Sequence, residues 1–153
     1  MSFASNSAAT GARLTTVGLC LLACLAGTGF GAYAATLDVT VSDIQPGPGN
    51  IRVALYANPD SFRHEDRAVQ VLSSPATSVS VVVVFKDIPA GQYAVLAYHD
   101  ANDNKKLDLR FGMFPIEGWG LSNDPTVIGP PRFSASAFDV ADPDSKQTVH
   151  LNY

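Results

Sequence analysis

The sequence predicts an all-β fold: an antiparallel β-sandwich of the immunoglobulin or transthyretin kind, with about seven strands and one long loop. Apolar and polar residues alternate in several short runs, as expected of strands that bury one face. Turn-forming residues separate the runs, and the chain of 153 residues holds 12 Gly and 10 Pro. After residue 35 no segment shows the 3.6-residue apolar period of an amphipathic helix. These observations together favour a sandwich.

Residues 1–34 are predicted to be a secretory signal peptide. Arg13 precedes an apolar run from Leu14 to Phe30, and Ala32-Tyr33-Ala34 is an A-x-A cleavage site. Glycines dilute the run and no charged flank follows it, which argues against a membrane anchor. Cleavage after Ala34 leaves a β-sandwich domain at 35–153 and predicts a periplasmic or secreted protein.

Both cysteines, Cys20 and Cys24, lie in this leader. The processed domain therefore has neither a disulfide nor thiol chemistry, although export would permit a disulfide. Leu21-Leu22-Ala23-Cys24 resembles a lipobox, so the alternative is a lipoprotein that reaches the membrane through Cys24.

The charge balance excludes one class of partner. The chain has 10 Lys+Arg against 14 Asp+Glu, a formal charge of −4, and no basic run. No nucleic-acid partner is expected, because nothing would neutralise phosphates. The partner we expect is an unidentified ligand or an envelope protein.

The first strands are expected at 36–42 and 51–56, where alternation is regular. The Pro- and Gly-rich turn at 45–50 joins them, which predicts an antiparallel hairpin. Residues 58–68 carry charges of both signs and predict a solvated loop or a short helical turn. Residues 69–72 predict a short edge strand.

The second half follows the same logic. Residues 79–85 are β-branched and almost continuously apolar, which predicts a strand buried on both faces. A turn at 87–91 leads into an alternating strand at 93–99 and predicts a second hairpin. Two more strands are expected at 135–140 and 148–153, around a turn at 142–144.

The stretch between residues 100 and 134 is too long for an ordinary hairpin loop, and such loops are functional or disordered. Its large apolar residues argue for a loop that packs onto the domain. They are Phe111, Met113, Phe114, Ile116, Trp119 and Phe133.

One candidate metal site lies in this stretch. Asp100, Asn102, Asn104 and Asp108 occupy positions 1, 3, 5 and 9 of an EF-hand-type calcium loop, and Lys106 at position 7 offers its carbonyl. Hard cations bind such converging oxygens, so calcium is the candidate cofactor of this loop, and its binding would be weak.

Two positions depart from the calcium-loop pattern. Lys105 stands at position 6, where a glycine normally allows the sharp turn, and Phe111 stands at position 12 instead of a bidentate glutamate. A carboxylate from elsewhere, Glu117 or Asp124, would have to replace that ligand. In the alternative reading, the Asp and Asn side chains form Asx-turns that brace the loop without metal.

The function that the sequence favours is a non-enzymatic binding or accessory module. No Gly-x-Ser-x-Gly, phosphate-binding or dinucleotide motif is present, and the histidines are too far apart for a zinc pair. The expected contact surface is the loop with Trp119, with Tyr98 and Phe114 as stacking faces. Alternatively Trp119 packs in the core, where Gly118 and Gly120 would let its ring approach the backbone.

A hydrolase-type enzyme is the rival hypothesis. His99 with Asp100 or Glu117 would serve as acid and base. The simpler interpretation of His99 is a solvated residue at a strand end.

Several motifs carry a resemblance to a known family. They are Gly91-Gln92-Tyr93-Ala94, Tyr98-His99-Asp100-Ala101-Asn102-Asp103-Asn104 with Leu107-Asp108, the segment 115–123, and Pro130-Pro131-Arg132-Phe133. In this order they resemble the bacterial secreted family DUF2141 over most of the domain. The resemblance implies a small exported β-sandwich without an assigned activity. The typical loop of the family reads H-D-x-N-x-N-G-x-x-D, from which Lys105 departs.

Overall fold

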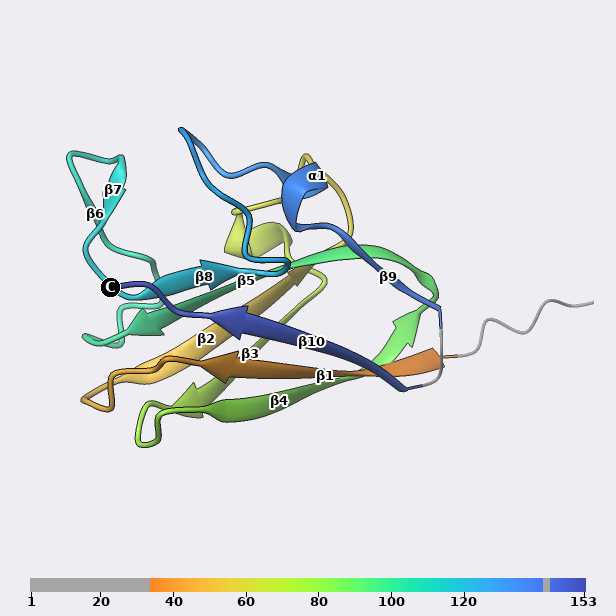
Figure 1. Cartoon of the computed structure of the whole chain (residues 1–153), viewed down its shortest axis with the longest axis horizontal. Helices are drawn as coiled ribbons and strands as arrows, with labels where there is room; N and C mark the ends of the chain where they lie inside the picture. Colours follow the sequence, from red (N-terminus) through yellow and green to blue (C-terminus); the bar gives the residue numbers. More distant parts are fainter. Residues whose placement is uncertain (1–33, 142–143) are drawn as a thin grey trace, which may run out of the picture. The chain divides into compact units, whose positions relative to one another are not determined.

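The computed structural model describes residues 34–141 and 144–153 (Figure 1). The predicted signal peptide therefore lies outside the described residues except for Ala34, which begins the first strand. The predicted turn at 142–144 also lies largely outside them. In the described part of the chain, no helix has the length and apolar character needed to cross a membrane.

Two sheets make up the domain, which confirms the predicted all-β fold (Figure 1). The first sheet has the order β10-β1-β4, with β1 at Ala34–Ser42, β4 at Val81–Pro89 and β10 at Asp144–His150. In it β1 pairs antiparallel with β4 and parallel with β10.

The second sheet has the order β3-β2-β5-β8. Its strands are β2 at Asn50–Tyr56, β3 at Gln70–Pro75, β5 at Gly91–Asp100 and β8 at Trp119–Leu121. The short strand β9, at Phe138–Val140, pairs with the beginning of β5.

Three small elements complete the domain. A separate hairpin consists of β6 at Leu109–Arg110 and β7 at Phe114–Pro115. The 3-10 helix η1 at Glu65–Arg67 matches the expected short helical turn, whereas the single-turn helix α1 at Phe133–Ser136 was not predicted.

The pairing predicted for both hairpins is wrong. β1 and β2 belong to different sheets, and so do β4 and β5. The segment 43–49 crosses between the sheets and hydrogen-bonds to the chain before β4, through Ile44 to Val79 and Gly47 to Ala76. Alternation indicates which face of a strand is buried. In a sandwich the following strand can help to bury that face either by pairing in the same sheet or by crossing to the opposite sheet.

The prediction that residues 79–85 are buried on both faces is also wrong. β4 is an edge strand of the first sheet, and its side chains alternate between the core and solvent. Phe85 is fully buried, whereas Val82 is 58% exposed. Apolar residues on the solvent face of β4 thus produced a sequence run that resembles a central strand.

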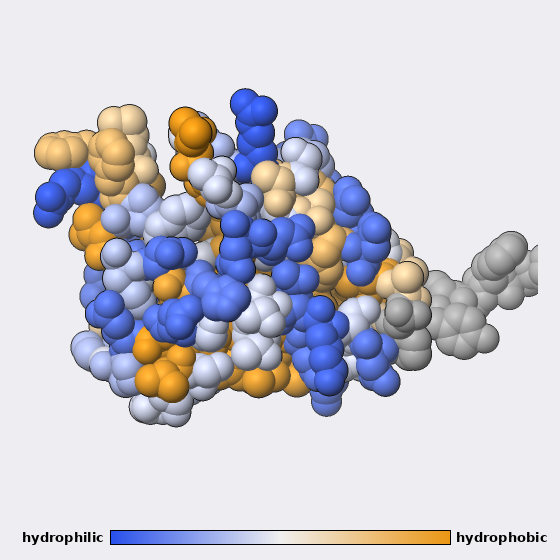
Figure 2. All heavy atoms as spheres, in the orientation of Figure 1, coloured by the Kyte–Doolittle hydropathy of each residue, from blue (hydrophilic) through white to orange (hydrophobic). Residues whose placement is uncertain are grey.

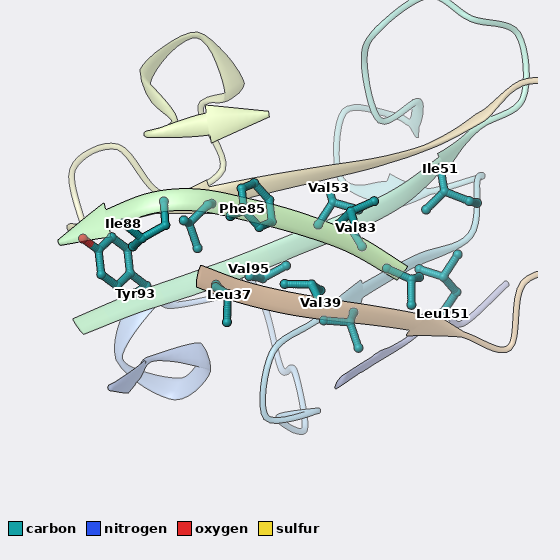
Figure 3. Packing of buried hydrophobic residues seen from close by; sticks show 14 of the residues in the cluster. Leu37, Val39, Ile51, Val53, Val83, Phe85, Ile88, Tyr93, Val95 and Leu151 are labelled. Carbon is teal, nitrogen blue, oxygen red and sulfur yellow. The ribbon is translucent and has the colours of Figure 1, made fainter. Parts of the chain in front are cut away.

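The main core lies between the two sheets (Figure 3). Leu37 and Val39 of β1 and Phe85 of β4 face Val53 of β2 and Val95 of β5. Each of these side chains is fully buried, and burying a side chain of this size stabilises the fold by about 1.5–3 kcal/mol.

A second apolar cluster covers the outer face of the β2-β5-β8 sheet. Tyr56 packs edge-on against Phe62, and Phe62 against Phe133, with ring centroids 5.4 and 5.9 Å apart. The long stretch after β5 therefore returns to the sheet through Leu121 and Phe133. Of the six apolar residues expected to pack it onto the domain, only Trp119 and Phe133 do so; the expectation is wrong for Phe111, Met113, Phe114 and Ile116, which are exposed.

Candidate functional site

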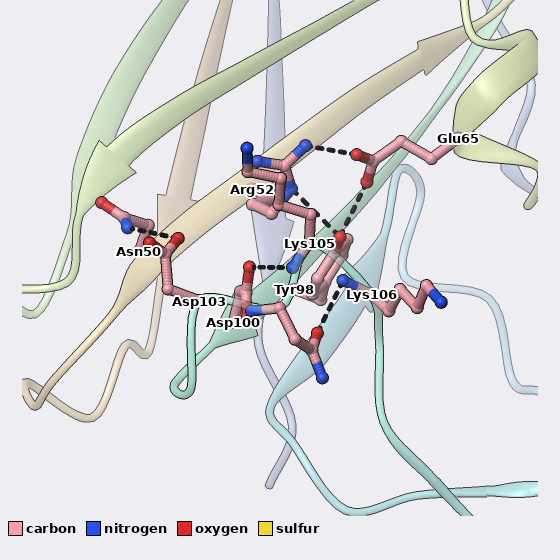
Figure 4. A network of polar contacts seen from close by, with 9 residues as sticks. Asn50, Arg52, Glu65, Tyr98, Asp100, Asp103, Lys105 and Lys106 are labelled. Carbon is pink, nitrogen blue, oxygen red and sulfur yellow. Dashed lines mark hydrogen bonds and ion pairs between the residues drawn. The ribbon is translucent and has the colours of Figure 1, made fainter.

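The loop that follows β5 is braced by its own side chains. The carboxylate of Asp100, which is fully buried, accepts hydrogen bonds from the backbone N–H groups of Asn104 and Lys105 at 2.9 and 2.8 Å. Asn102 Oδ1 also accepts from Asn104 N–H at 3.1 Å. Figure 4 shows Asp100 beneath the turn at Lys105 and Lys106. These contacts are the Asx-turn bracing expected of a loop without metal.

The predicted calcium ligands lie together in this loop. Asn102 Nδ2 and Asn104 Nδ2 donate to the carboxylate of Asp108 at 2.8 and 3.0 Å. Asn104 Oδ1 accepts from the backbone N–H of Lys106 at 2.8 Å. The four side chains therefore lie near one another, with the amide nitrogens of Asn102 and Asn104 directed at Asp108, and hydrogen bonds within the loop occupy their polar atoms.

Lys105 has a positive φ of 62°, the conformation that the glycine of a calcium loop adopts. Glu117 also joins the loop, because its carboxylate accepts from the N–H groups of Ala101 at 3.1 Å and Asp108 at 2.9 Å. Asp124 lies elsewhere. Among the described residues no group of three or more His, Cys, Asp or Glu side chains is placed to hold a metal ion.

His99 is buried, with 6% of its surface exposed, so its interpretation as a solvated residue is wrong. Its Nε2 lies 2.9 Å from the Pro48 carbonyl, and its Nδ1 lies 3.0 Å from the Tyr153 hydroxyl. A carbonyl can only accept, so Nε2 donates to Pro48, and in the neutral imidazole Nδ1 accepts from the Tyr153 hydroxyl. Pro48, in the turn before β2, and Tyr153 thus cover His99 at the end of β5, where the sequence predicted exposure to solvent.

The hydrolase hypothesis gains no support from these groups. Both nitrogens of His99 and both carboxylate oxygens of Glu117 are hydrogen-bonded within the domain. Asp100 is likewise engaged with backbone N–H groups. A proton-transfer pair would need at least one of these atoms directed at a substrate.

Tyr98 offers no stacking face, because it is 2% exposed. Its hydroxyl donates to Glu65 Oε2 at 2.7 Å and accepts from Arg52 Nε at 3.1 Å, while Arg52 and Glu65 form an ion pair (Figure 4). Burial, together with the nearby Glu65 carboxylate, raises the pKa of the Tyr98 hydroxyl. This network fastens η1 to the outer face of β2 and β5.

Trp119 lines a cleft with a volume of about 520 Å³. The segment 119–127 forms one side, and His150 and Asn152 at the end of the chain form the other. Asp124 Oδ2 lies 2.6 Å from His150 Nδ1, and both side chains are about half exposed. The cleft therefore presents the indole of Trp119, the hydrogen-bonded side chains of Asp124 and His150, and the carboxamide of Asn152.

The two walls of the cleft meet through backbone hydrogen bonds. Trp119 N–H donates to Asn152 O, and Asn152 N–H donates to Trp119 O, each at 2.9 Å. A Cβ at Gly120 would lie 2.1 Å from the carbonyl oxygen of His150. Glycine at this position therefore permits the chain end to approach β8.

Gly118 has a related role, since a Cβ there would lie 2.4 Å from the ring of Tyr153. The two glycines thus accommodate the C-terminal segment, not the ring of Trp119 as the sequence suggested. Trp119 itself is half-buried and packs against the outer apolar cluster while lining the cleft.

The sequence did not single out Asn152, and His150 and Asp124 were considered only for metal sites. They lie far from Trp119 in sequence, and only the pairing of the chain end with β8 brings them together. Phe114, the third expected stacking residue, lies on the β6-β7 hairpin and does not line the cleft.

Fold and sites together define a β-sandwich protein whose long loop carries the candidate sites. A family profile described as an uncharacterized protein conserved in bacteria, DUF2141, matches residues 39–148. The chain belongs to this family, as its motifs indicated. No curated protein and no solved structure shows significant similarity to the chain.

Proposed function

We propose that this protein is an exported, non-enzymatic binding module that takes its ligand in the cleft beside Trp119. The observation that carries the proposal is the cleft of about 520 Å³ in which an indole adjoins Asp124, His150 and Asn152. Binding sites combine an apolar wall with a few polar groups that orient the ligand, and this lining has that composition.

The chemistry of the lining favours a saccharide or a similar ring with one apolar face and several hydroxyl groups. The indole supplies a face on which such a ring stacks. Asp124 accepts hydrogen bonds, and the carboxamide of Asn152 both donates and accepts them. The hydrogen bond between His150 Nδ1 and Asp124 Oδ2 holds the carboxylate in one orientation.

Two cleft variants and one matched control test the proposal by calorimetric titration with neutral and N-acetylated hexose oligomers. Asn152→Ala and His150→Ala should each weaken binding by about 5- to 30-fold, because a hydrogen bond to a polar ligand contributes about 1–2 kcal/mol. Phe114→Ala removes an exposed aromatic residue outside the cleft and should leave binding unchanged. Equal binding by all three variants would contradict the proposal.

Export is tested separately by the mass of the processed chain. An N-terminus at Ala35 supports the signal peptide and a periplasmic or secreted location. A lipid-modified Cys24 would instead make the protein a lipoprotein, and an intact Met1 would contradict export.

We also propose weak calcium binding by Asp100, Asn102, Asn104 and Asp108, with a carbonyl from Lys106. The grouping of these side chains and the positive φ of 62° at Lys105 support it. Calcium would replace the hydrogen bonds that now occupy the oxygens, which is consistent with low affinity.

Thermal unfolding with and without calcium tests this second proposal. At ten times Kd, calcium should stabilise the fold by about 1.4 kcal/mol, which raises Tm by several degrees. Asp108→Asn removes a charged ligand whose side chain is half-buried and outside both apolar clusters, and should abolish the shift without unfolding the domain. Mg²⁺ should have less effect because it gives up water reluctantly. An unchanged Tm up to millimolar calcium would leave the Asx-turns as the only role of these residues.

A further inference from the structure

The β6-β7 hairpin concentrates exposed apolar side chains. Its apolar residues face solvent to an unusual degree: Leu109 43%, Phe111 83%, Met113 69%, Phe114 61% and Ile116 61% exposed. Figure 1 shows the hairpin projecting from the sheets, and Figure 2 shows tan and orange side chains gathered on it. Soluble domains rarely leave a contiguous apolar patch of this kind without a use for it.

The tip of the hairpin is strained as well as exposed. Met113 N–H donates to the carbonyl of Arg110 at 3.2 Å, and φ is 56° at Phe111 and 69° at Gly112. This is a type I′ turn, whose first central position normally holds Asn, Asp or Gly because other residues are strained there. Phe111 gains no packing within the domain in return, so a contact outside the chain explains it better.

Neither face of the hairpin is directed at the core. Arg110 pairs with Phe114 and Leu109 pairs with Pro115, and directly paired residues share a face. Exposed apolar side chains therefore occupy both faces and the tip. A flat protein partner would cover one face only, whereas the boundary of a lipid bilayer would surround the hairpin.

The charges beside the hairpin favour an anionic surface. Between residues 100 and 117 the exposed charged side chains are three cations, Lys105, Lys106 and Arg110, and one carboxylate, Asp103. The other carboxylates of this segment, Asp100, Asp108 and Glu117, are buried or half-buried and accept hydrogen bonds within the loop. All three cations are exposed, and none of them forms an ion pair with a residue in 34–141 or 144–153. Screening limits charge effects to roughly 10 Å, so the exposed cations beside the hairpin, and not the net charge of the whole chain, govern which surface the hairpin approaches.

A second apolar tip lies in the segment between β8 and α1, where Ile128 is 94% exposed. In Figure 1 this segment rises on the same side of the domain as the hairpin. Two tips directed to one side suit insertion into a planar surface.

We propose that the β6-β7 hairpin inserts its apolar tip into the interfacial region of a membrane rich in anionic lipids. Phe111 and Met113 enter the boundary between headgroups and acyl chains, while Lys105, Lys106 and Arg110 contact the headgroups. This surface is separate from the cleft beside Trp119, and its use does not depend on a ligand there. It also differs from anchoring through Cys24, because it needs no covalent lipid.

Cosedimentation with vesicles tests the proposal on the chain recovered from an exporting host, with its N-terminus verified by mass. Vesicles made of equal parts phosphatidylglycerol and phosphatidylcholine should sediment the protein, and phosphatidylcholine alone should do so weakly. Phe111→Asn should lower the partition coefficient about 10- to 100-fold, the effect of burying one Phe side chain. Asn-Gly is the preferred type I′ pair, so this variant should keep or raise Tm.

Three further variants sharpen the test. Phe111→Trp should retain binding, and Val82→Thr, which alters an exposed apolar residue on β4, should bind as the unchanged protein does. Arg110→Gln should lower the partition coefficient for anionic vesicles about fivefold at low salt and should change it little at high salt. Failure to sediment with anionic vesicles would overturn the proposal. So would equal binding by Phe111→Asn, or a dimer that this variant converts to a monomer, which would make a second copy the hairpin's partner.

Discussion

Gly120→Ala tests how the cleft is assembled, because Gly120 stands where β8 meets the end of the chain. The added Cβ would lie 2.1 Å from the carbonyl oxygen of His150 and 2.9 Å from Val149 Cγ1. Ordinary contacts begin near 3.4 Å, so the carbonyl would have to retreat by about 1 Å. A carbonyl oxygen is backbone, and it cannot rotate away as a side chain would.

The expected cost has two parts. Overpacking a well-packed interior costs about 1–3 kcal/mol. The displacement also loosens the two hydrogen bonds of 2.9 Å between Trp119 and Asn152, each of which contributes about 0.5–1.5 kcal/mol. Gly120→Ala should therefore lower the free energy of unfolding by about 2–5 kcal/mol, a large part of the stability of a small domain.

Urea unfolding gives the free energy, and hydrogen exchange at the Trp119 and Asn152 amides locates the loss. Gly112→Ala is the matched control, because Gly112, unlike Gly120, has no atom within 4 Å of the added Cβ, so that only its φ of 69° opposes the change. That control should cost about 1 kcal/mol. A Gly120→Ala domain as stable as the control, with both amides still protected, would refute the close approach of β8 and the chain end.

Three further predictions concern the polar groups. Glu65→Ala leaves the Arg52 guanidinium unpaired where its side chain is 14% exposed, so urea unfolding should show a loss of about 2–3 kcal/mol, and a loss below about 0.5 kcal/mol would contradict the network. Burial raises the pKa of the Tyr56 and Tyr98 hydroxyls above the ordinary value of 10.0, so the stability from their neutral forms is complete below pH 10 and is lost as pH rises through the folded pKa values. Between pH 10 and its folded pKa, each tyrosine should lower the free energy of unfolding by about 1.4 kcal/mol per pH unit. Tyr98→Phe should therefore make Tm fall less steeply as the pH rises above 10. Lys105→Gly should increase any calcium-dependent rise in Tm by relieving the φ of 62° and removing a cation, and a smaller rise would contradict that role.

The buried face of a strand was more predictable from the sequence than the strand with which it pairs. The alternation in 36–42 correctly indicated which side chains are buried, because a strand places successive residues on opposite faces. In 51–56 it did not, because the outer apolar cluster also buries Ala54 and Tyr56. It did not reveal that β1 pairs with β10, which lies more than a hundred residues away in the chain. Local pattern carries no information on whether the following segment turns back or crosses to the other sheet.

The candidate loop was predictable because its residues are consecutive. Asp100, Asn102, Asn104 and Asp108 lie near one another as their spacing indicated, whereas calcium binding by these residues stays a prediction. The cleft was not predictable, since the pairing of Trp119 with Asn152 joins segments with no shared motif. Short-range spacing reveals a loop site, whereas a site between strands requires the topology.

Trp119 is the single tryptophan of the chain, so its fluorescence reports on the proposed ligand site alone. Titration with neutral and N-acetylated hexose oligomers tests binding in the cleft most directly. The proposal predicts a saturable shift in emission that Asn152→Ala weakens and that Phe111→Asn, which alters the hairpin only, leaves unchanged. An emission spectrum that no oligomer alters, or a shift that persists undiminished in Asn152→Ala, would contradict a ligand site beside Trp119.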